Sequence, residues 1–186
     1  MRTLRETLNY LLREDIEEIR RSGSHTAKYN EFIDWAKSEA DKISTDRVSF
    51  QGFEFQWAES DHVKLIVYLN GETVGYVALE KFLDGYKIDA LGVKPAVRGA
   101  GIAMKAYGYI LTRTKLYSDK LQSPEARKLW VRLSKVYDVK GIDIKTKQTF
   151  DIEPNNKGHE LRPVDNSNNL YSRKKAGDIH LVIEKI

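Results

Sequence analysis

The chain has 186 residues, 41% of them hydrophobic and 31% charged, with a formal net charge of +4 at pH 7. This balance predicts one folded domain. The small excess of positive charge is of a size that is common on solvated protein surfaces. The absence of cysteine excludes disulfides and thiolate nucleophiles. The four histidines lack the paired spacing of a zinc site, and no apolar run is long enough for a membrane span. We therefore expect a cytoplasmic protein that binds neither metal nor membrane.

Two amphipathic helices are predicted ahead of the first strand. Leucine and isoleucine recur at steps of three and four residues over residues 4–19, which places them on one helix face. A second helix is predicted to begin after Ser24 or Thr26 and to carry an apolar stripe as far as Ile43. Residues 1–45 therefore form a helical N-terminal segment.

The hydrophobic period changes to two from Arg47 onward, which predicts a change from helix to sheet. Apolar residues alternate over residues 48–55, with an irregularity near Gly52, and the run at 63–69 predicts the next strand. The chain therefore enters a sheet at this point.

Two short turn sequences connect the following strands. Asn70-Gly71 leads into a strand at 73–79, and Asp84-Gly85 leads into a strand at about 86–93. Such pairs favour two-residue hairpins because the turn positions need φ above zero. These strands are therefore predicted to form an antiparallel meander.

A helix, a short strand and a second helix are predicted after the meander. The first helix covers about residues 99–115, and the short strand covers 116–118. The second helix covers about 123–136, because Ser123 is a good N-cap and Pro124 suits the first helical position.

Strand and loop alternate in the remaining chain. Residues 139–150 alternate like a strand, residues 151–177 are polar and predict a long loop, and residues 178–186 predict a final strand. No internal repeat or linker divides the sequence. We therefore expect a single domain over residues 1–186, with its sheet and motif core at 47–150.

Small residues gather where the last strand of the meander leads into the next helix. Residues 98–103 read Arg-Gly-Ala-Gly-Ile-Ala, so unpaired backbone N–H groups can converge on an anion without side chains in the way. Gly99 and Gly101 allow close approach of the backbone to that anion. The sequence therefore predicts a pyrophosphate site at this junction.

Two other interpretations apply to the same junction. A dinucleotide site of the Rossmann kind would use Asp119, about twenty residues on, to hold a ribose. Such a site needs parallel strands and a third glycine, whereas these strands are joined by two-residue turns and Met104 replaces the glycine. The glycines also suit tight packing of a helix on a sheet.

Two motifs resemble those of the GNAT superfamily of N-acetyltransferases. Residues 90–95, Ala-Leu-Gly-Val-Lys-Pro, followed by Arg98-x-x-Gly101-x-Ala103, resemble its motif A. Further on, Ser123-x-x-Ala126-x-x-Leu129-Trp130 resembles the family's N-x-x-A-x-x-L-Y helix, with Ser for Asn and Trp for Tyr. The resemblance covers about residues 47–150, and residues 116–130 also resemble small GNAT-like proteins encoded by bacteriophages.

The resemblance implies an α+β (α/β) fold with a mixed, mostly antiparallel central sheet of about six to seven strands flanked by helices. The hydrophobic pattern of residues 1–45 places two helices N-terminal to the first strand. The resemblance also implies an acyl-CoA-dependent N-acyltransferase, and specifically an N-acetyltransferase that uses acetyl-CoA or another acyl-CoA. The acceptor is an amine, which attacks the thioester directly, so most of the acceleration comes from holding the two substrates together. The class of acceptor is left open.

Particular residues are implied to bind the cofactor. The pyrophosphate is held by backbone N–H groups of Arg98, Gly99, Ala100, Gly101, Ile102 and Ala103. Backbone groups of Leu91 and Val93 hold the pantetheine arm and the thioester carbonyl, and the bond to that carbonyl strengthens as negative charge develops on its oxygen.

Asp89 is the first candidate for the base that deprotonates the acceptor ammonium. It lies two residues before Leu91 and hence on the same strand face, near the expected thioester, where partial burial raises the pKa of a carboxyl. An ion pair with Lys87, or exposure to water, is the alternative interpretation of this residue.

The proton donor for the departing thiolate has several candidates. Trp130 stands where family members often carry a tyrosine, and its indole N–H does not titrate usefully, so we expect it in the core. Tyr117 and Ser118 are the candidate donors, with Tyr137, a water chain or unassisted departure as alternatives. The early helices also precede the first strand, whereas the family commonly places them after it, so acceptor specificity is not carried over.

Two other functions remain open. A GNAT-fold binding protein without catalysis would contact host protein or nucleic acid through the basic loop that contains Arg162, Arg173, Lys174 and Lys175. A nucleic-acid-modifying acyltransferase would use the same loop to guide a base to the thioester. The simplest interpretation of the loop is a solvated insertion.

Overall fold

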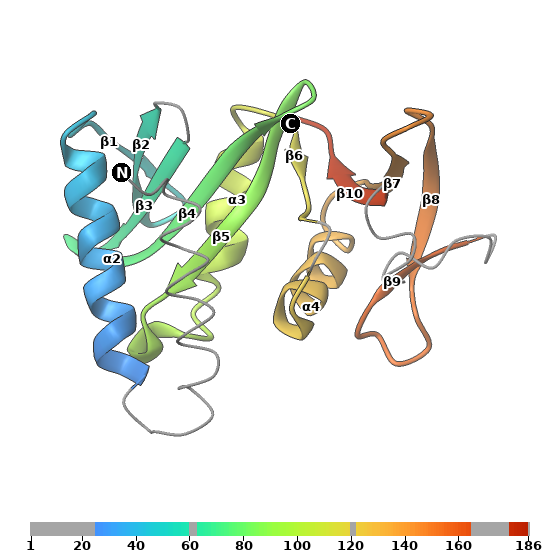
Figure 1. Ribbon diagram of the computed structural model, residues 1–186. Coiled ribbons are helices and arrows are strands. Elements are labelled where there is room, and N and C mark those ends of the chain that lie inside the picture. The colour runs from blue at the N-terminus through green and yellow to red at the C-terminus, as the bar shows by residue number, and fades with distance from the viewer. Residues whose placement is uncertain (1–24, 60–62, 120–121, 165–178, 186) are drawn as a thin grey trace.

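A ten-stranded sheet is the main feature of the computed structural model, which describes residues 25–59, 63–119, 122–164 and 179–185 (Figure 1). The predicted helix over residues 4–19 lies outside this range. The strands are β1 (Arg47–Phe50), β2 (Phe53–Glu59), β3 (Val63–Leu69), β4 (Glu72–Phe82), β5 (Gly85–Val93), β6 (Leu116–Tyr117), β7 (Val139–Asp143), β8 (Thr149–Pro154), β9 (Leu161–Pro163) and β10 (Ile179–Ile183). Their order across the sheet is β1-β2-β3-β4-β5-β6-β10-β7-β8-β9.

Neighbouring strands pair antiparallel throughout, except that β5 and β6 pair in parallel. The mostly antiparallel α+β architecture is therefore confirmed. The predicted count of six to seven strands is too low, because some stretches predicted as one strand contain two strands and the predicted loop also contains a strand. Residues 139–150 contain β7 and the start of β8, and β9 lies inside the expected loop at 151–177.

Hairpin turns account for the first of the extra strands. Gln51 and Gly52 have φ angles of 51° and 84°, so they turn the chain between β1 and β2 where the sequence predicts only an irregularity. Asn70 and Gly71, with φ angles of 53° and 82°, form the predicted turn between β3 and β4. Two positive φ angles in succession are the conformation that links strands with native twist.

Gly85 has a different role from the predicted one. The β4–β5 turn consists of Leu83, with a φ angle of 51°, and Asp84, while Gly85 is already the first residue of β5. A Cβ atom at Gly85 would lie 2.4 Å from the carbonyl oxygen of Lys115, which accepts the N–H of Tyr86 at 3.0 Å. The glycine is therefore needed for the close approach of the chain that enters β6.

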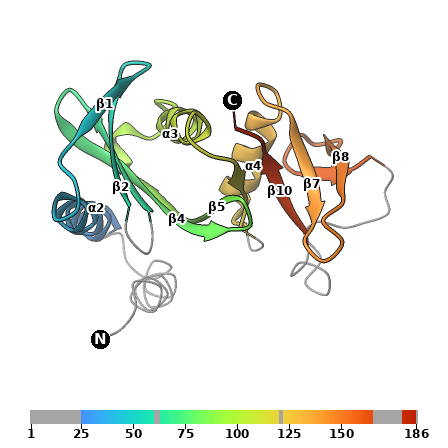
Figure 2. The same ribbon diagram turned by 90° about the horizontal axis from the view of Figure 1, so that it is seen from above.

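Helices cover both faces of the sheet. The helix α2 (His25–Asp41) packs Ile33, Ala36 and Ala40 on one face, close to the predicted extent of the second early helix. The helices α3 (Ile102–Leu111) and α4 (Pro124–Leu133) pack into the main core on the opposite face (Figure 2). Among the described residues, no helix has the length and apolar character required to cross a membrane.

Strands β5 and β6 lie side by side, and the chain that follows β6 then separates from β5 (Figure 1). Their parallel pairing consists of Tyr86 with Leu116 and Lys87 with Tyr117. Beyond this point Ser118 bonds β10 instead, because its N–H donates to the carbonyl of Leu181 at 2.9 Å. The rest of β5 pairs only with β4 among the described strands, so a gap opens between β5 and β6 toward the end of β5.

The strand β10 lies between β6 and β7 and pairs antiparallel with both. All five of its residues are buried, and three of them, Ile179, Leu181 and Ile183, belong to the main core. The predicted final strand is therefore confirmed, but it occupies an interior position in the sheet.

Candidate functional site

The junction after β5 forms an open group of backbone donors. A short 3-10 helix, η1 (Pro95–Val97), is followed by Gly99 and Gly101 with φ angles of 88° and 77°, and Gly101 is the N-cap of α3. A Cβ atom at either glycine would meet nothing within 4 Å, so the space in front of the backbone is open. An anion can therefore approach this turn without contact with a side chain.

The donors at this turn differ in part from the predicted set. Lys105 is the first residue of α3 whose N–H bonds within the helix, to the carbonyl of Gly101 at 3.1 Å. The preceding N–H groups, those of Ile102, Ala103 and Met104, have no intrahelical acceptor by the geometry of a helix start. Met104 is thus a donor that the sequence interpretation missed, because it placed the helix start at residue 99.

Two of the predicted donors already have acceptors within the turn. The N–H of Arg98 donates to the carbonyl of Pro95 at 3.3 Å, and the N–H of Ala100 donates to the carbonyl of Val97 at 3.3 Å. These bonds hold the turn in shape. The pyrophosphate prediction is therefore better matched by the first turn of α3 and by Gly99 than by Arg98 and Ala100.

The backbone of β5 presents polar groups to the gap. The N–H of Lys94 bonds the carbonyl of Val74 at 2.9 Å, so by alternation along the strand the peptide groups of Leu91 and Val93 point away from β4. The Val93 carbonyl accepts the Arg98 Nε–H at 3.3 Å. This direction agrees with the predicted role of Leu91 and Val93 in holding the pantetheine arm and the thioester carbonyl. That role stays a prediction.

Asp89 lies at a β-bulge. Ile88 pairs with Leu79 and Ala90 pairs with Ala78, so Asp89 is an extra residue in β5. Ile88 and Leu91 both pack on the main core although they are three residues apart. The alternation of side chains is therefore interrupted at this bulge, and the position of Asp89 on the face of Leu91 stays a prediction. Its role as base stays a prediction.

Lys87, the suggested ion-pair partner of Asp89, forms an ion pair with another carboxylate. Lys87 Nζ lies 3.0 Å from the Glu80 carboxylate on the neighbouring strand. Asp89 itself is partly buried and stands just past the last β5–β6 pair, where the gap begins.

Tyr117 is buried at the closed end of the gap. Its hydroxyl donates to Asp84 Oδ1 at 2.5 Å, and its ring packs edge-on against Phe82. Burial and the hydrogen bond to the Asp84 carboxylate hold the pKa of Tyr117 well above its usual range. Tyr117 is therefore poorly suited to give up a proton to a thiolate.

Ser118 and Trp130 are also engaged within the protein. The Ser118 hydroxyl oxygen accepts the N–H of Leu181 at 2.9 Å and is buried. Trp130 is 2% exposed, and its ring lies 6.3 Å from that of Tyr107 in the main core. The expectation that Trp130 packs in the core is confirmed.

The basic loop is described only in part. Arg162 lies on β9, and its guanidinium bonds the Glu153 carboxylate of β8 at 2.8 Å. The residues Arg173, Lys174 and Lys175 lie outside the described range. The one arginine of this group that the structure describes therefore has its charge paired within the protein.

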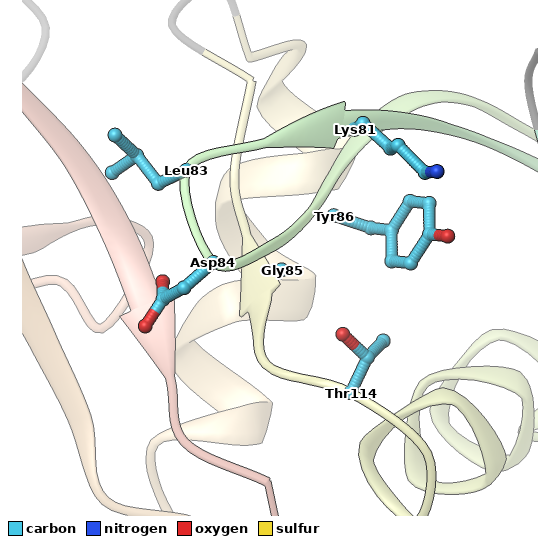
Figure 3. A pocket seen from close by; sticks show the side chains of 6 residues that line it. All are labelled: Lys81, Leu83, Asp84, Gly85, Tyr86 and Thr114. Atoms are coloured by element: carbon cyan, nitrogen blue, oxygen red, sulfur yellow. The ribbon is translucent and has the colours of Figure 1, made fainter.

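A depression of about 220 Å³ lies at the other end of β5 (Figure 3). It is lined by Lys81, Leu83, Asp84, Gly85, Tyr86 and Thr114. Gly85 and Val93 stand at opposite ends of the strand, roughly 26 Å apart at the rise of an extended chain. This depression is therefore separate from the backbone donors at the start of α3.

Comparison with known proteins identifies the family. Residues 16–123, more than half of the chain, match the acetyltransferase (GNAT) family. No curated protein sequence matches the chain.

Two solved structures that are named as acetyltransferases are similar to the chain. The ribosomal-protein-S18-alanine N-acetyltransferase from Escherichia coli is 10% identical, with 89% of this chain and 92% of that chain covered and a TM-score of 0.39. A protein from Bacteroides thetaiotaomicron assigned to the GNAT family is also 10% identical, with coverage of 68% and 63% and a TM-score of 0.39. On the strength of the family match, the chain belongs to the acetyltransferase (GNAT) family.

Proposed function

We propose that this protein transfers an acyl group from an acyl-CoA thioester to an amine, with acetyl-CoA as the donor. The observation that carries the proposal is the gap between β5 and β6, which is closed at the Lys87–Tyr117 pair and leads to the open backbone donors at the start of α3. An extended arm with an anionic end fits such a gap, because one end offers peptide groups and the other offers a helix N-terminus.

The pyrophosphate would bind the N–H groups of Gly99, Ile102, Ala103 and Met104. The dipole of α3 adds about 0.3–1 kcal/mol of favourable interaction with a negative group at this end. The pantetheine amides would bond the outward peptide groups of Leu91 and Val93, as a further strand bonds a sheet edge. Holding donor and acceptor together in this way can supply roughly 7–11 kcal/mol of the reduction in barrier.

Asp89 is the proposed base for the acceptor ammonium. The bulge supports this role differently from strand alternation, because the extra residue sits where β5 loses its second neighbour and the gap begins. Bulges recur next to active sites, where they direct a side chain that regular pairing would not.

A GNAT-fold binding protein is the second candidate function. It is favoured by the engagement of Tyr117 and Ser118 in internal hydrogen bonds and by the position of Trp130 in the core. Such a protein would bind acyl-CoA at the same backbone donors without transferring the acyl group.

Thermal unfolding with acetyl-CoA tests the binding step. A ligand at 100 times its dissociation constant stabilises a protein by about 2.7 kcal/mol, which raises the melting temperature by several degrees. Gly101→Val should abolish this rise, because a β-branched side chain fills the open space at the donors. Gly158→Val is the matched control, since Gly158 also has a positive φ angle, of 64°, and open space, and lies in the β8–β9 loop.

Acyl transfer is tested with isotopically labelled acetyl-CoA and a panel of small amines, peptides and proteins. Labelled product together with thermal stabilisation supports the acyltransferase. Stabilisation without product from any amine favours the binding protein, and absence of stabilisation refutes both.

A further inference from the structure

The ring of Tyr76 lies over the backbone of β5. Tyr76 of β4 pairs directly with Gly92 of β5. A Cβ atom at Gly92 would lie 2.3 Å from Cε1 of that ring, 2.9 Å from Cδ1 and 3.3 Å from Cζ. A side chain at residue 92 and the ring cannot therefore occupy the same place. The glycine leaves its position on the strand to an aromatic ring from the neighbouring strand.

The ring lies on the face of the sheet that α2 covers. Tyr76 is 7% exposed and belongs to the core cluster that α2 forms with this face. Leu91 and Val93, on either side of Gly92, pack on the main core of the opposite face. The part of β5 with outward peptide groups is therefore covered by the main core on one face and by the Tyr76 ring on the other.

Residues 91–93 also form an edge of the gap. Leu91 and Val93 are only partly buried, although β5 lies inside the sheet. A molecule bonded to their outward peptide groups would run alongside β5 as a further strand, about 4.8 Å away. Substituents at directly opposite positions of such a pair stand about 4.5–5.5 Å apart. Because the Tyr76 ring takes the place of a side chain at residue 92, that molecule meets the ring on this face.

We propose that Tyr76 is a positioning residue that lines the gap beside the pantetheine arm of acyl-CoA, an inference that rests on the proposed function. The arm is a flexible chain of methylene and amide groups, and a flat ring beside it limits the conformations that it can adopt. The ring also keeps water from the outward peptide groups on this face, which strengthens their hydrogen bonds to the arm. The role of Gly92 is then to admit the ring.

Two ligands separate the arm from the rest of the cofactor. CoA has the pantetheine arm, whereas 3′-phosphoadenosine 5′-diphosphate has the nucleotide and the pyrophosphate without it. Calorimetric titration of the full chain gives the dissociation constant of each. We expect Tyr76→Leu to weaken the binding of CoA about tenfold, which is the size of an aromatic contact, and to leave the binding of the nucleotide unchanged. Tyr76→Phe keeps the ring and should bind CoA as the unsubstituted chain does. Equal weakening of both ligands by Tyr76→Leu, or of neither, overturns the inference.

Gly92→Ala tests the same contact from the other strand. The added methyl group displaces the Tyr76 ring, so this variant should also weaken the binding of CoA about tenfold. In the Tyr76→Leu background it should have little further effect, because the ring is already absent. An equal effect of Gly92→Ala in both backgrounds would mean that the methyl group acts on β5 itself, and it would overturn the inference.

Tyr68→Leu is the matched control. Tyr68 of β3 is fully buried in the same core cluster, so its loss also removes an aromatic ring from this face, but the ratio of the two dissociation constants should not change. If Tyr76→Leu does not fold, Gly92→Ala alone decides. Weaker binding of CoA with unchanged binding of the nucleotide supports the inference, and an equal loss of both overturns it. If the unsubstituted chain does not bind CoA, the proposed function fails, and the inference fails with it.

Discussion

Replacing Gly85 with alanine tests how β6 is attached to β5. An added Cβ would lie 2.4 Å from the Lys115 carbonyl oxygen and 3.0 Å from its carbon, both of them backbone atoms that no side-chain rotation can move. The same oxygen accepts the N–H of Tyr86. The two segments must therefore separate, and this hydrogen bond is lost with them.

The expected loss of stability follows from these two effects. Overpacking costs roughly 1–3 kcal/mol and a lost hydrogen bond about 1 kcal/mol, so Gly85→Ala should lower the free energy of unfolding by about 2–4 kcal/mol. Urea denaturation followed by circular dichroism measures this difference. Gly52→Ala is the control, because a Cβ there meets nothing and only the positive φ angle opposes it, at about 1–2 kcal/mol. A loss for Gly85→Ala no larger than that for the control would refute the reasoning.

Three further predictions concern the site and its surroundings. Asp89→Asn should lower acetyl transfer roughly 100-fold while the thermal stabilisation by CoA is retained, and undiminished transfer would remove Asp89 as base. Ser123→Ala should lower the free energy of unfolding in urea by about 1 kcal/mol, since the Ser123 side chain accepts a backbone N–H of α4 at 3.2 Å; an unchanged midpoint would contradict this cap. The hydrogen bond from Lys115, and then that from a tyrosine hydroxyl, hold the pKa of Asp84 below its ordinary value. This carboxylate therefore contributes stability above that ordinary pKa, which is lost as the pH falls through the lowered one. Asp84→Asn should reduce the dependence of the melting temperature on pH in that acid range. An unchanged dependence would show that the Asp84 carboxylate does not stabilise the folded protein.

Features set by adjacent residues were predictable from the sequence. The Asn70-Gly71 turn, the Ser123 cap and the small residues at 99–103 each follow from the conformation that a few neighbouring residues favour. The turn before α3 is also of this kind, because glycine reaches the positive φ angles of Gly99 and Gly101 without strain. The helix begins later than predicted, which adds Met104 to the donors, and bonds within the turn engage the N–H groups of Arg98 and Ala100.

Features set by distant segments were not predictable in this way. The role of Gly85 depends on Lys115, and the bulge at Asp89 is visible only in the pairing of β5 with β4. A bulge interrupts the alternation of side chains along a strand, so the face of Asp89 does not follow from counting residues back from Leu91.

The interior position of β10 has a consequence for the order of folding. The strands from β1 to β5 pair with sequence neighbours, so they can form early from local contacts. β6 has only two pairs with β5, and its other partner, β10, is more than sixty residues further along the chain. Closing that long loop is slow relative to forming a hairpin. We therefore expect the half of the sheet beyond β5 to form last, after the backbone donors at the start of α3 are in place.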